Sequence, residues 1–218
     1  MSDSPPSLII QQLGLRDYES VWQEMKQFTA SRIASSHDVS TPDELWFVEH
    51  PPVFTMGLNG KSEHVINPDP IAVINVDRGG QVTYHGPGQM VVYTLIDLKR
   101  LNIGIRAFVQ RLEQTIINLL YSYNIKSNAR VDAPGVYVNQ AKIAALGLRV
   151  KRNQVYHGLS LNIDMDLEPF SRINPCGYED MEVTQLIDHA EYQHMEEIRQ
   201  KFIGYFTSIM GYNKPLLP

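Results

Sequence analysis

Short apolar segments bounded by glycine, proline or asparagine recur along most of the chain. Their β-branched and aromatic residues predict strands at 8–13, 43–49, 53–57, 71–76, 90–98, 131–138, 141–150 and 155–163. Apolar residues at steps of three and four predict helices at 17–34 and 105–123, and a closing helix is expected at 191–210. This pattern indicates one α+β, or mixed α/β, domain over 7–218, with residues 1–6 as a flexible polar tail.

The composition of the 218-residue chain excludes several classes of protein. Its apolar fraction of 43% and charged fraction of 20% are ordinary for a globular protein. A formal charge of -5 gives no reason to expect a nucleic-acid partner, and no segment approaches the roughly 20 apolar residues of a membrane span. One cysteine excludes an intramolecular disulfide, and the acidic start of the chain lacks the basic region of a signal peptide. We therefore expect a soluble cytoplasmic protein.

The single cysteine, Cys176, lies among turn-forming residues. Asn174 and Pro175 precede it and Gly177 follows it, whereas a core strand would not be interrupted in this way. A lone cysteine is more often a small buried hydrophobe than a reactive group. Here the neighbours favour a shaped, partly exposed loop, and loops held by a rigid scaffold are common sites of reactive groups. Cys176 is therefore a candidate nucleophile.

Lys142 is a candidate partner for that thiol. It stands at the head of the apolar run KIAALG, where a lysine more often extends its side chain to solvent. A cation near a thiol lowers the thiol pKa from about 8.5, and a partly desolvated lysine can accept a proton. A Cys–His dyad with His50 or His85 remains an alternative, because each histidine lies beside a turn at a strand end. The histidines form no zinc-type pair, so we expect no metal site.

The stretch RGGQVTYHGPGQ, residues 78–89, contains four glycines. Glycine lets the backbone approach a ligand closely. The spacing fits neither G-x-x-x-x-G-K-[ST] nor a G-x-G-x-x-G turn that opens a helix, so a nucleotide phosphate site is disfavoured. The alternative is an irregular hairpin, since glycine often marks turns. The presence of Arg78, Tyr84 and His85 among these glycines favours a ligand-lining loop.

Six segments together resemble one family. They are HPPVFTMG (50–57), RGGQVTYHGPGQ (78–89), PGVYV (134–138), KIAALG (142–147), HGLSLN (157–162) and INPCG (173–177). They are similar in order and spacing to the lipoyl(octanoyl) transferases of the lipoate/biotin protein ligase superfamily. The resemblance implies a large mixed β-sheet flanked by helices plus a smaller β-sheet, as in biotin and lipoate ligases. It also implies transfer of an octanoyl group from octanoyl-acyl carrier protein to a lysine of lipoyl domains, in 2-oxoacid dehydrogenases and in the glycine cleavage H protein, with no cofactor.

The resemblance also implies roles for individual residues. Cys176 would carry the acyl group as a thioester, and Lys142 would lower the thiol pKa and handle protons. The acyl pocket would be lined by Arg78, Gly79, Gly80, Gln81, Val82, Thr83, Tyr84, His85, Gly86, Ala145, Leu146, Gly147, Gly158, Leu159 and Ser160. Two alternatives remain, an ATP-dependent lipoate ligase on the same fold and a non-catalytic acyl-binding module. The basic cluster at 149–152 is either a solvated strand end, the commoner case, or a surface that steers acidic carrier domains.

Overall fold

A computed structural model describes residues 7–35, 41–131, 133–174, 181–191, 194–213 and 215. Its main feature is a seven-stranded sheet in the order β1-β2-β6-β10-β9-β8-β7. The strands are β1 (Leu8–Leu15), β2 (Asp43–Glu49), β6 (Gln89–Asp97), β7 (Asn128–Ala129), β8 (Gly135–Val138), β9 (Ala141–Lys151) and β10 (Gln154–Asn162). The β1–β2 pair is parallel and the other pairs are antiparallel, so the sheet is mixed.

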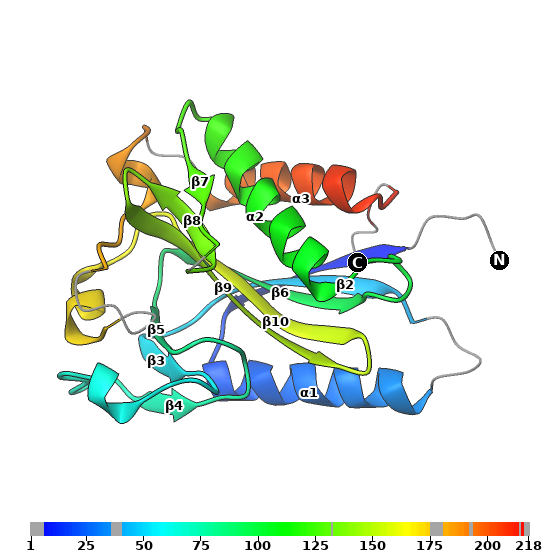
Figure 1. Cartoon of the computed structure of the whole chain (residues 1–218), viewed down its shortest axis with the longest axis horizontal. Helices are drawn as coiled ribbons and strands as arrows, with labels where there is room; N and C mark the ends of the chain where they lie inside the picture. The colour runs from blue at the N-terminus through cyan, green and yellow to red at the C-terminus, as the bar shows by residue number, and fades with distance from the viewer. Residues whose placement is uncertain are drawn as a thin grey trace.

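A smaller, three-stranded sheet in the order β4-β3-β5 lies beside the beginning of α1 (Figure 1). Its strands are β3 (Val53–Met56), β4 (Val73–Asn75) and β5 (Val82–His85). The glycine-rich stretch therefore contains a strand that the glycine spacing does not predict. The described residues also contain the short 3₁₀ turns η1 (Ser62–His64), η2 (Glu168–Arg172) and η4 (Leu186–Asp188).

Helices cover both faces of the large sheet. α1 (Tyr18–Ala34) lies on the face that carries the small sheet, whereas α2 (Ile105–Tyr121) and α3 (Met195–Met210) lie on the other face (Figure 1). On α2 the buried residues Phe108, Leu112 and Ile116 recur at steps of four, and they share one apolar core with Phe202 and Phe206 of α3. A separate core joins α1 to the opposite face of the sheet. This two-faced burial confirms the predicted mixed α/β fold with a large and a small sheet.

The structure corrects three element boundaries. The predicted strand at 131–138 is wrong in its first half, because Val131 is fully exposed and β8 begins only at Gly135. Pro134 has no N–H to offer a sheet, which accounts for this late start. The closing helix begins at Met195 rather than at 191, and β4 covers only the centre of the predicted 71–76 strand. The predicted tail at 1–6 lies outside the described residues.

Candidate active site

A pocket lies between the two sheets. It contains about 740 Å³ of space free of protein atoms, part of it open to solvent. One wall comes from β9 and β10 of the large sheet, and the other from β5 and the loop before it. The pocket therefore opens onto the glycine-rich stretch that the sequence singles out.

Small residues on one face of the large sheet create the hollow. Ala145 pairs with Ser160, and Gly147 pairs with Gly158. Residues two apart on a strand share a face, so these four residues form a shallow floor. A Cβ at Gly158 would lie 1.9 Å from the carbonyl oxygen of Val92. Glycine is thus required at this position by the close approach of β6.

Arg78 and Gly79 close one end of the pocket. The Arg78 guanidinium donates to the Thr55 carbonyl at 2.6 Å and to its hydroxyl at 2.8 Å. The N–H of Gly79 donates to the carbonyl of Leu148 on β9 at 2.9 Å. A Cβ at Gly147 would lie 3.0 Å from Cδ of Arg78, so the loop rests directly on the sheet there.

Lys142 lies at the other end of the pocket. Its side chain is buried, with the residue 4% exposed, and its Nζ lies 3.5 Å from the carbonyl oxygen of Pro134 and 5.3 Å from the centre of the Tyr137 ring. A Cβ at Gly135 would lie 3.1 Å from Lys142 Cε. Gly135, at a φ of +147°, therefore leaves the space that this long side chain occupies.

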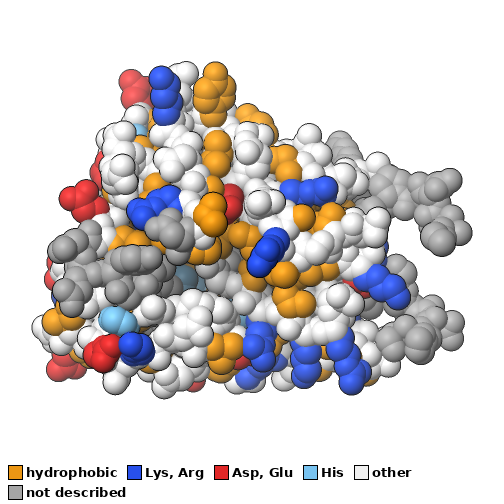
Figure 2. Space-filling view, in the orientation of Figure 1, with side chains coloured by type: hydrophobic (Ala, Val, Ile, Leu, Met, Phe, Trp, Pro, Cys, Tyr) orange, Lys and Arg blue, Asp and Glu red, His pale blue; other side chains and the backbone are white. Residues whose placement is uncertain are grey.

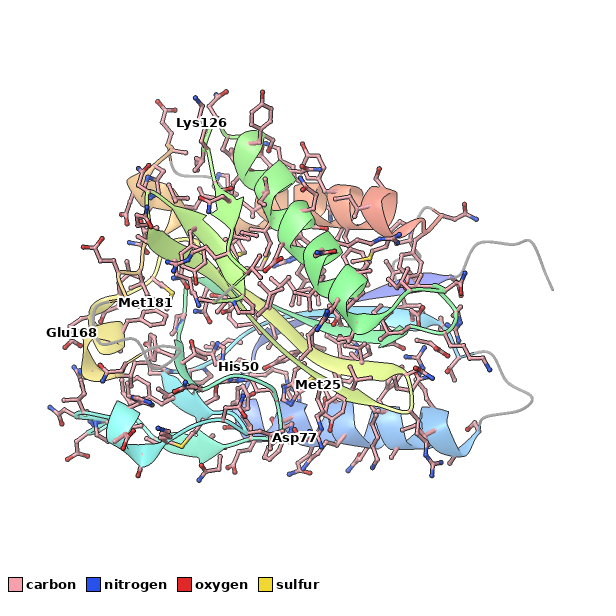
Figure 3. The ribbon with its side chains drawn as sticks, in the orientation of Figure 1. Met25, His50, Asp77, Lys126, Glu168 and Met181 are labelled. Carbon is pink, nitrogen blue, oxygen red and sulfur yellow. The ribbon has the colours of Figure 1, made fainter. Side chains whose placement is uncertain are left out.

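Cys176 falls in 175–180, which lies outside the described residues, but the chain on both sides of this stretch is fixed. Before it, Asn174 N–H donates to the His64 carbonyl at 2.8 Å. After it, the backbone of 182–184 runs beside Lys142: Lys142 N–H donates to Glu182 at 2.8 Å, and Thr184 N–H donates to Lys142 at 3.0 Å. Figure 3 labels Met181, the first described residue after the gap, on the same side of the molecule as Glu168.

Buried amides connect the small sheet to this segment. The His85 ring donates from Nδ1 to Gln89 Oε1 at 2.7 Å, and Gln89 Nε2 donates to Asn162 Oδ1 at 2.9 Å. Asn162 Nδ2 then donates to the Thr184 carbonyl at 3.0 Å. Burial lowers the pKa of His85 to about 3, so the ring is neutral at pH 7. This row of hydrogen bonds holds the backbone of Thr184 in place next to Lys142.

His50 belongs to a second buried network. Its Nδ1 lies 2.7 Å from the carbonyl of Arg16, so that nitrogen carries the proton, and Nε2 accepts from the Tyr93 hydroxyl at 2.7 Å. Burial lowers the pKa of His50 to about 4. The His50 ring also packs on Tyr18 with centroids 5.0 Å apart, and Figure 3 labels His50 beside the beginning of α1.

A third network surrounds Asp77, next to Arg78. The Asp77 carboxylate accepts from Trp22 Nε1 at 2.8 Å, from His157 Nε2 at 2.9 Å and from the Tyr156 hydroxyl. Burial alone would raise the pKa of this carboxyl, but the three donors lower it well below its usual range. The network orients His157, which has a φ of +60° and lines the pocket beside Gly158.

The structure places most of the predicted site residues around this one pocket. Those that line it are Arg78, Gly80, Gln81, Val82, Thr83, His85, Lys142, Ala145, Leu146, Gly147, Gly158, Leu159 and Ser160. Gly79, Tyr84 and Gly86 do not line it. The Tyr84 ring instead packs against Phe54 and Phe170, and a Cβ at Gly86 would collide with the Tyr84 ring.

Sequence reasoning misses several lining residues, namely Tyr18, Val91, Tyr93, Ala144, His157, Asn162, Phe170 and Val183. Val91 and Tyr93 are two apart on β6, so a period of two could link them. β6 is buried on both faces, however, and its apolar run does not indicate which face meets the pocket. The residues around Tyr18 in the sequence do not indicate that it lines a pocket, because it reaches the pocket only through the packing of α1.

The predicted basic cluster at 149–152 lies far from Lys142. Arg149, Lys151 and Arg152 are exposed at the end of the β9–β10 hairpin, roughly 23 Å or more from Lys142 along β9. Lys and Arg side chains are spread along the side of the molecule formed by α1 and this hairpin (Figure 2). This location favours the reading as a solvated strand end.

The described residues contain neither a candidate metal site nor a candidate membrane span. Over 7–35, 41–131 and the later described ranges, no three His, Cys, Asp or Glu side chains are grouped to hold a metal ion. In the same part of the chain, no helix is long and apolar enough to span a membrane.

Comparison with known proteins identifies the family. A family model described as the lipoyl protein ligase A/B catalytic domain matches residues 18–207. An octanoyltransferase of Shewanella sp. strain W3-18-1 is 55% identical over 206 residues, which cover 94% of this chain and 93% of that protein. The chain belongs to the octanoyltransferase family. It is an enzyme of the acyltransferase class, as the resemblance of its six segments predicts.

Solved structures show the same fold at low sequence identity. The bipartite lipoate protein ligase of Thermoplasma acidophilum gives a TM-score of 0.72 at 14% identity, covering 99% of this chain and 88% of that one. The biotin protein ligase of Aquifex aeolicus, bound to biotin and ATP, gives 0.58 at 11% identity, covering 94% and 70%. The predicted biotin/lipoate ligase-like fold is therefore confirmed.

Proposed function

We propose that this octanoyltransferase-family enzyme carries an octanoyl group on Cys176 while the acyl chain occupies the pocket between the two sheets. The donor is octanoyl-acyl carrier protein, and the acceptor is a lysine of a lipoyl domain. The observation that carries the proposal is the position of Lys142. It is buried at one end of the pocket, and the backbone of 182–184, which follows the cysteine-bearing stretch, is hydrogen-bonded directly to it.

The chemistry needs two steps. In the first, the Cys176 thiolate attacks the donor thioester carbonyl, the carbon–sulfur bond to the carrier breaks, and the carrier thiol takes up a proton. In the second, the substrate lysine amine attacks the acyl-Cys176 carbonyl, an amide forms, and the Cys176 thiol is released with a proton. The first step exchanges one thioester for another, so no ATP is needed. The two steps predict ping-pong kinetics.

Lys142 is a better proton partner than His50 or His85, because the ring nitrogens of these two histidines already face hydrogen-bonding groups. Both ring nitrogens of His50 are hydrogen-bonded, to Arg16 and Tyr93. His85 likewise uses Nδ1 for Gln89, and its Nε2 faces the Thr55 hydroxyl at 3.4 Å. Lys142 therefore lowers the thiol pKa in the first step, and it accepts the proton of the substrate amine, whose reference pKa is about 10.4, in the second.

One structural relative supports the proposed acceptor. The Thermoplasma acidophilum ligase was solved together with work on its E2 lipoyl domain, which supports a lipoyl domain as the acceptor here. The glycine cleavage H protein is proposed as a second acceptor of the same type. A reactive thiol that must stay reduced suits the cytoplasm, where we place the reaction.

Intact-mass measurement tests the proposal. Incubation with octanoyl-acyl carrier protein should add one octanoyl group, removable by hydroxylamine, and Cys176→Ala should abolish the gain. In the Lys142→Ala variant, alkylation by iodoacetamide should require a higher pH than in the wild type. The same adduct on Cys176→Ala would exclude Cys176 as the nucleophile. Release of AMP from ATP and free octanoate would identify a ligase instead.

A further inference from the structure

The large sheet is interrupted beside Lys142, where β10 no longer pairs with β9. The register of these two strands ends with Ala144 opposite Leu161, two residues short of Lys142. At Lys142 the place of β10 is taken by the backbone of 182–184, which makes one parallel bridge there. The N–H and the carbonyl of Lys142 are both bonded to that segment. Because the segment follows the stretch that carries Cys176, its position also fixes where that stretch ends.

The side chain of Asn162 reaches across this interruption. Asn162 is the last residue of β10, and its Nδ2 donates to the Thr184 carbonyl at 3.0 Å. Its Oδ1 accepts from Gln89 Nε2 at 2.9 Å, and Gln89 is the residue opposite it on β6. Asn162 and Gln89 are 4% and 0% exposed. Two buried amides therefore connect the segment 182–184 to the body of the large sheet.

Backbone carbonyls fix the orientation of both amides. Gln89 Nε2 also donates to the Tyr84 carbonyl at 3.2 Å, so its NH₂ group faces two oxygen atoms, and its Oε1 is left to accept from His85 Nδ1. Asn162 likewise turns its NH₂ group to the Thr184 carbonyl, because a carbonyl oxygen can only accept. Turning either amide over would place two buried acceptors against each other. Donation therefore runs in one direction, from His85 to Thr184.

The same row of hydrogen bonds begins at the other end of the pocket. Arg78 Nη2 donates to the Thr55 hydroxyl oxygen at 2.8 Å, which leaves the hydroxyl hydrogen for His85 Nε2 at 3.4 Å. His85 is neutral, since burial lowers its pKa to about 3, and its Nδ1 carries the proton that Gln89 Oε1 accepts. Buried hydrogen bonds thus connect Arg78 to the backbone beside Lys142.

We propose that Asn162 and Gln89 are positioning residues for the transfer reaction. Through the backbone of 182–184, they set the distance between the Cys176 thiol and the Lys142 amine. This inference rests on the proposed function, in which that thiol is the nucleophile and that amine is its proton partner. Loss of either amide leaves the segment with fewer bonds to the sheet. A shift of about 1 Å between two reacting groups lowers a rate by roughly a hundredfold.

The test compares Asn162→Ala, which removes both amide bonds, with Gln89→Met, which keeps the length of the side chain. The readouts are the rate of Cys176 acylation by octanoyl-acyl carrier protein and the pH dependence of Cys176 alkylation by iodoacetamide. Each variant should lower the acylation rate roughly 10- to 100-fold and move the alkylation profile toward that of Lys142→Ala. Because the two amides act in one row, the double variant should be no slower than the slower single variant.

Two comparisons separate positioning from a general loss of stability. Tyr212→Phe is the matched control, because Tyr212 is 8% exposed and donates its hydroxyl hydrogen to Asp43 Oδ2 at 2.8 Å, and neither residue lines the pocket. This variant also loses one buried hydrogen bond, but its acylation rate and alkylation profile should equal those of the wild type. In the Lys142→Ala background, Asn162→Ala should cause no further shift of the profile, because the amine is absent.

Acylation rates and alkylation profiles equal to those of Tyr212→Phe in the folded variants would overturn the inference. A full additional shift in the Lys142→Ala background would also overturn it. Denaturant unfolding reports whether each variant is folded. If Asn162→Ala is not folded, Gln89→Met decides, and loss of folding in both would make the two amides purely structural and overturn the inference as well. A wild type that accepts no octanoyl group, or a Lys142→Ala profile equal to that of the wild type, would instead overturn the proposed function.

Discussion

Glu113 offers a direct test of how the scaffold positions Lys142. It lies on α2, on the opposite face of the sheet from the pocket, and is 7% exposed. Its Oε1 accepts from the N–H of Gly135 at 3.1 Å. Gly135 in turn packs on Cε of Lys142, and the carbonyl of the preceding Pro134 lies 3.5 Å from Nζ. We predict that Glu113→Ala weakens acyl transfer although Glu113 does not line the pocket.

The magnitude follows from the hydrogen bond. Truncation to alanine leaves the buried Gly135 N–H without its acceptor, which costs about 1–3 kcal/mol of stability. If the backbone at 134–135 then shifts by about 1 Å, Lys142 moves with it, and a misplacement of that size lowers a rate by roughly a hundredfold. Burial raises the pKa of Glu113, and the bond from Gly135 opposes this rise. Glu113→Gln keeps an acceptor oxygen and should retain both stability and rate.

The assay combines chemical unfolding with the pH dependence of Cys176 alkylation. In Glu113→Ala the alkylation profile should move toward that of Lys142→Ala, and Glu113→Gln should restore it. Gln114→Ala serves as the control, since Gln114 is the exposed neighbour on the same helix and bonds only to Asn118. If Glu113→Ala keeps the stability and alkylation profile of Gln114→Ala, the link from α2 to Lys142 is refuted.

Three further predictions concern stability. The pKa values of His50 and His85 are lowered by burial to about 4 and about 3, below about 6.5 in an unfolded chain, so the unfolded state binds more protons between these values. The contribution of these two histidines to stability is full above pH 6.5 and is lost as the pH falls toward 4 and 3. The denaturant midpoints at pH 7, 5.5 and 4.5 should therefore decrease in that order. Equal midpoints would contradict the burial argument. Gly158→Ala should destabilise by more than 1–3 kcal/mol, because its Cβ would lie 1.9 Å from the Val92 carbonyl. Gly204→Ala on α3, where nothing lies within 4 Å of the added atom, should stabilise by about 0.5–1 kcal/mol. Denaturant unfolding at pH 7 measures both glycine variants.

The elements that the sequence predicts well are those whose signal is local. The apolar stripe of α2 is read from steps of three and four, and the helix begins at Ile105 as predicted. The β8–β9 hairpin is predicted from two apolar runs and the turn at 139–140 between them. The strand at 131–134 fails for the same reason, because local β-branched content says nothing about whether a partner strand is present.

The floor of the pocket and the positions of Tyr18 and Tyr93 in its lining depend instead on register and on long-range packing. The pairing of Gly147 with Gly158, and of Gly158 with Tyr93, brings together residues from three strands. Tyr18 and Tyr93 are 75 positions apart, and no periodicity connects them. The family resemblance names residues of the glycine-rich loop and of β9 and β10, but not these tyrosines. A residue that lines a site because of its place in the sheet cannot be identified from the sequence until the strand register is known.

Octanoyltransferases are similar to this chain in sequence, whereas lipoate and biotin ligases are similar to it only in fold. This contrast suggests which part of the site determines the chemistry. Lipoate and biotin ligases share this fold with only 11–14% identity, so the fold is a scaffold that many sequences can build. The floor residues Ala145, Gly147, Gly158 and Ser160 are small, and their small side chains leave a hollow on this face of the sheet. What activates the acyl group is separate from that hollow. In the proposed mechanism the thioester donor arrives already activated, so the enzyme needs only a thiol and a proton acceptor near its carbonyl carbon. We propose that Lys142 and the segment bonded to it form the place where both meet that carbon.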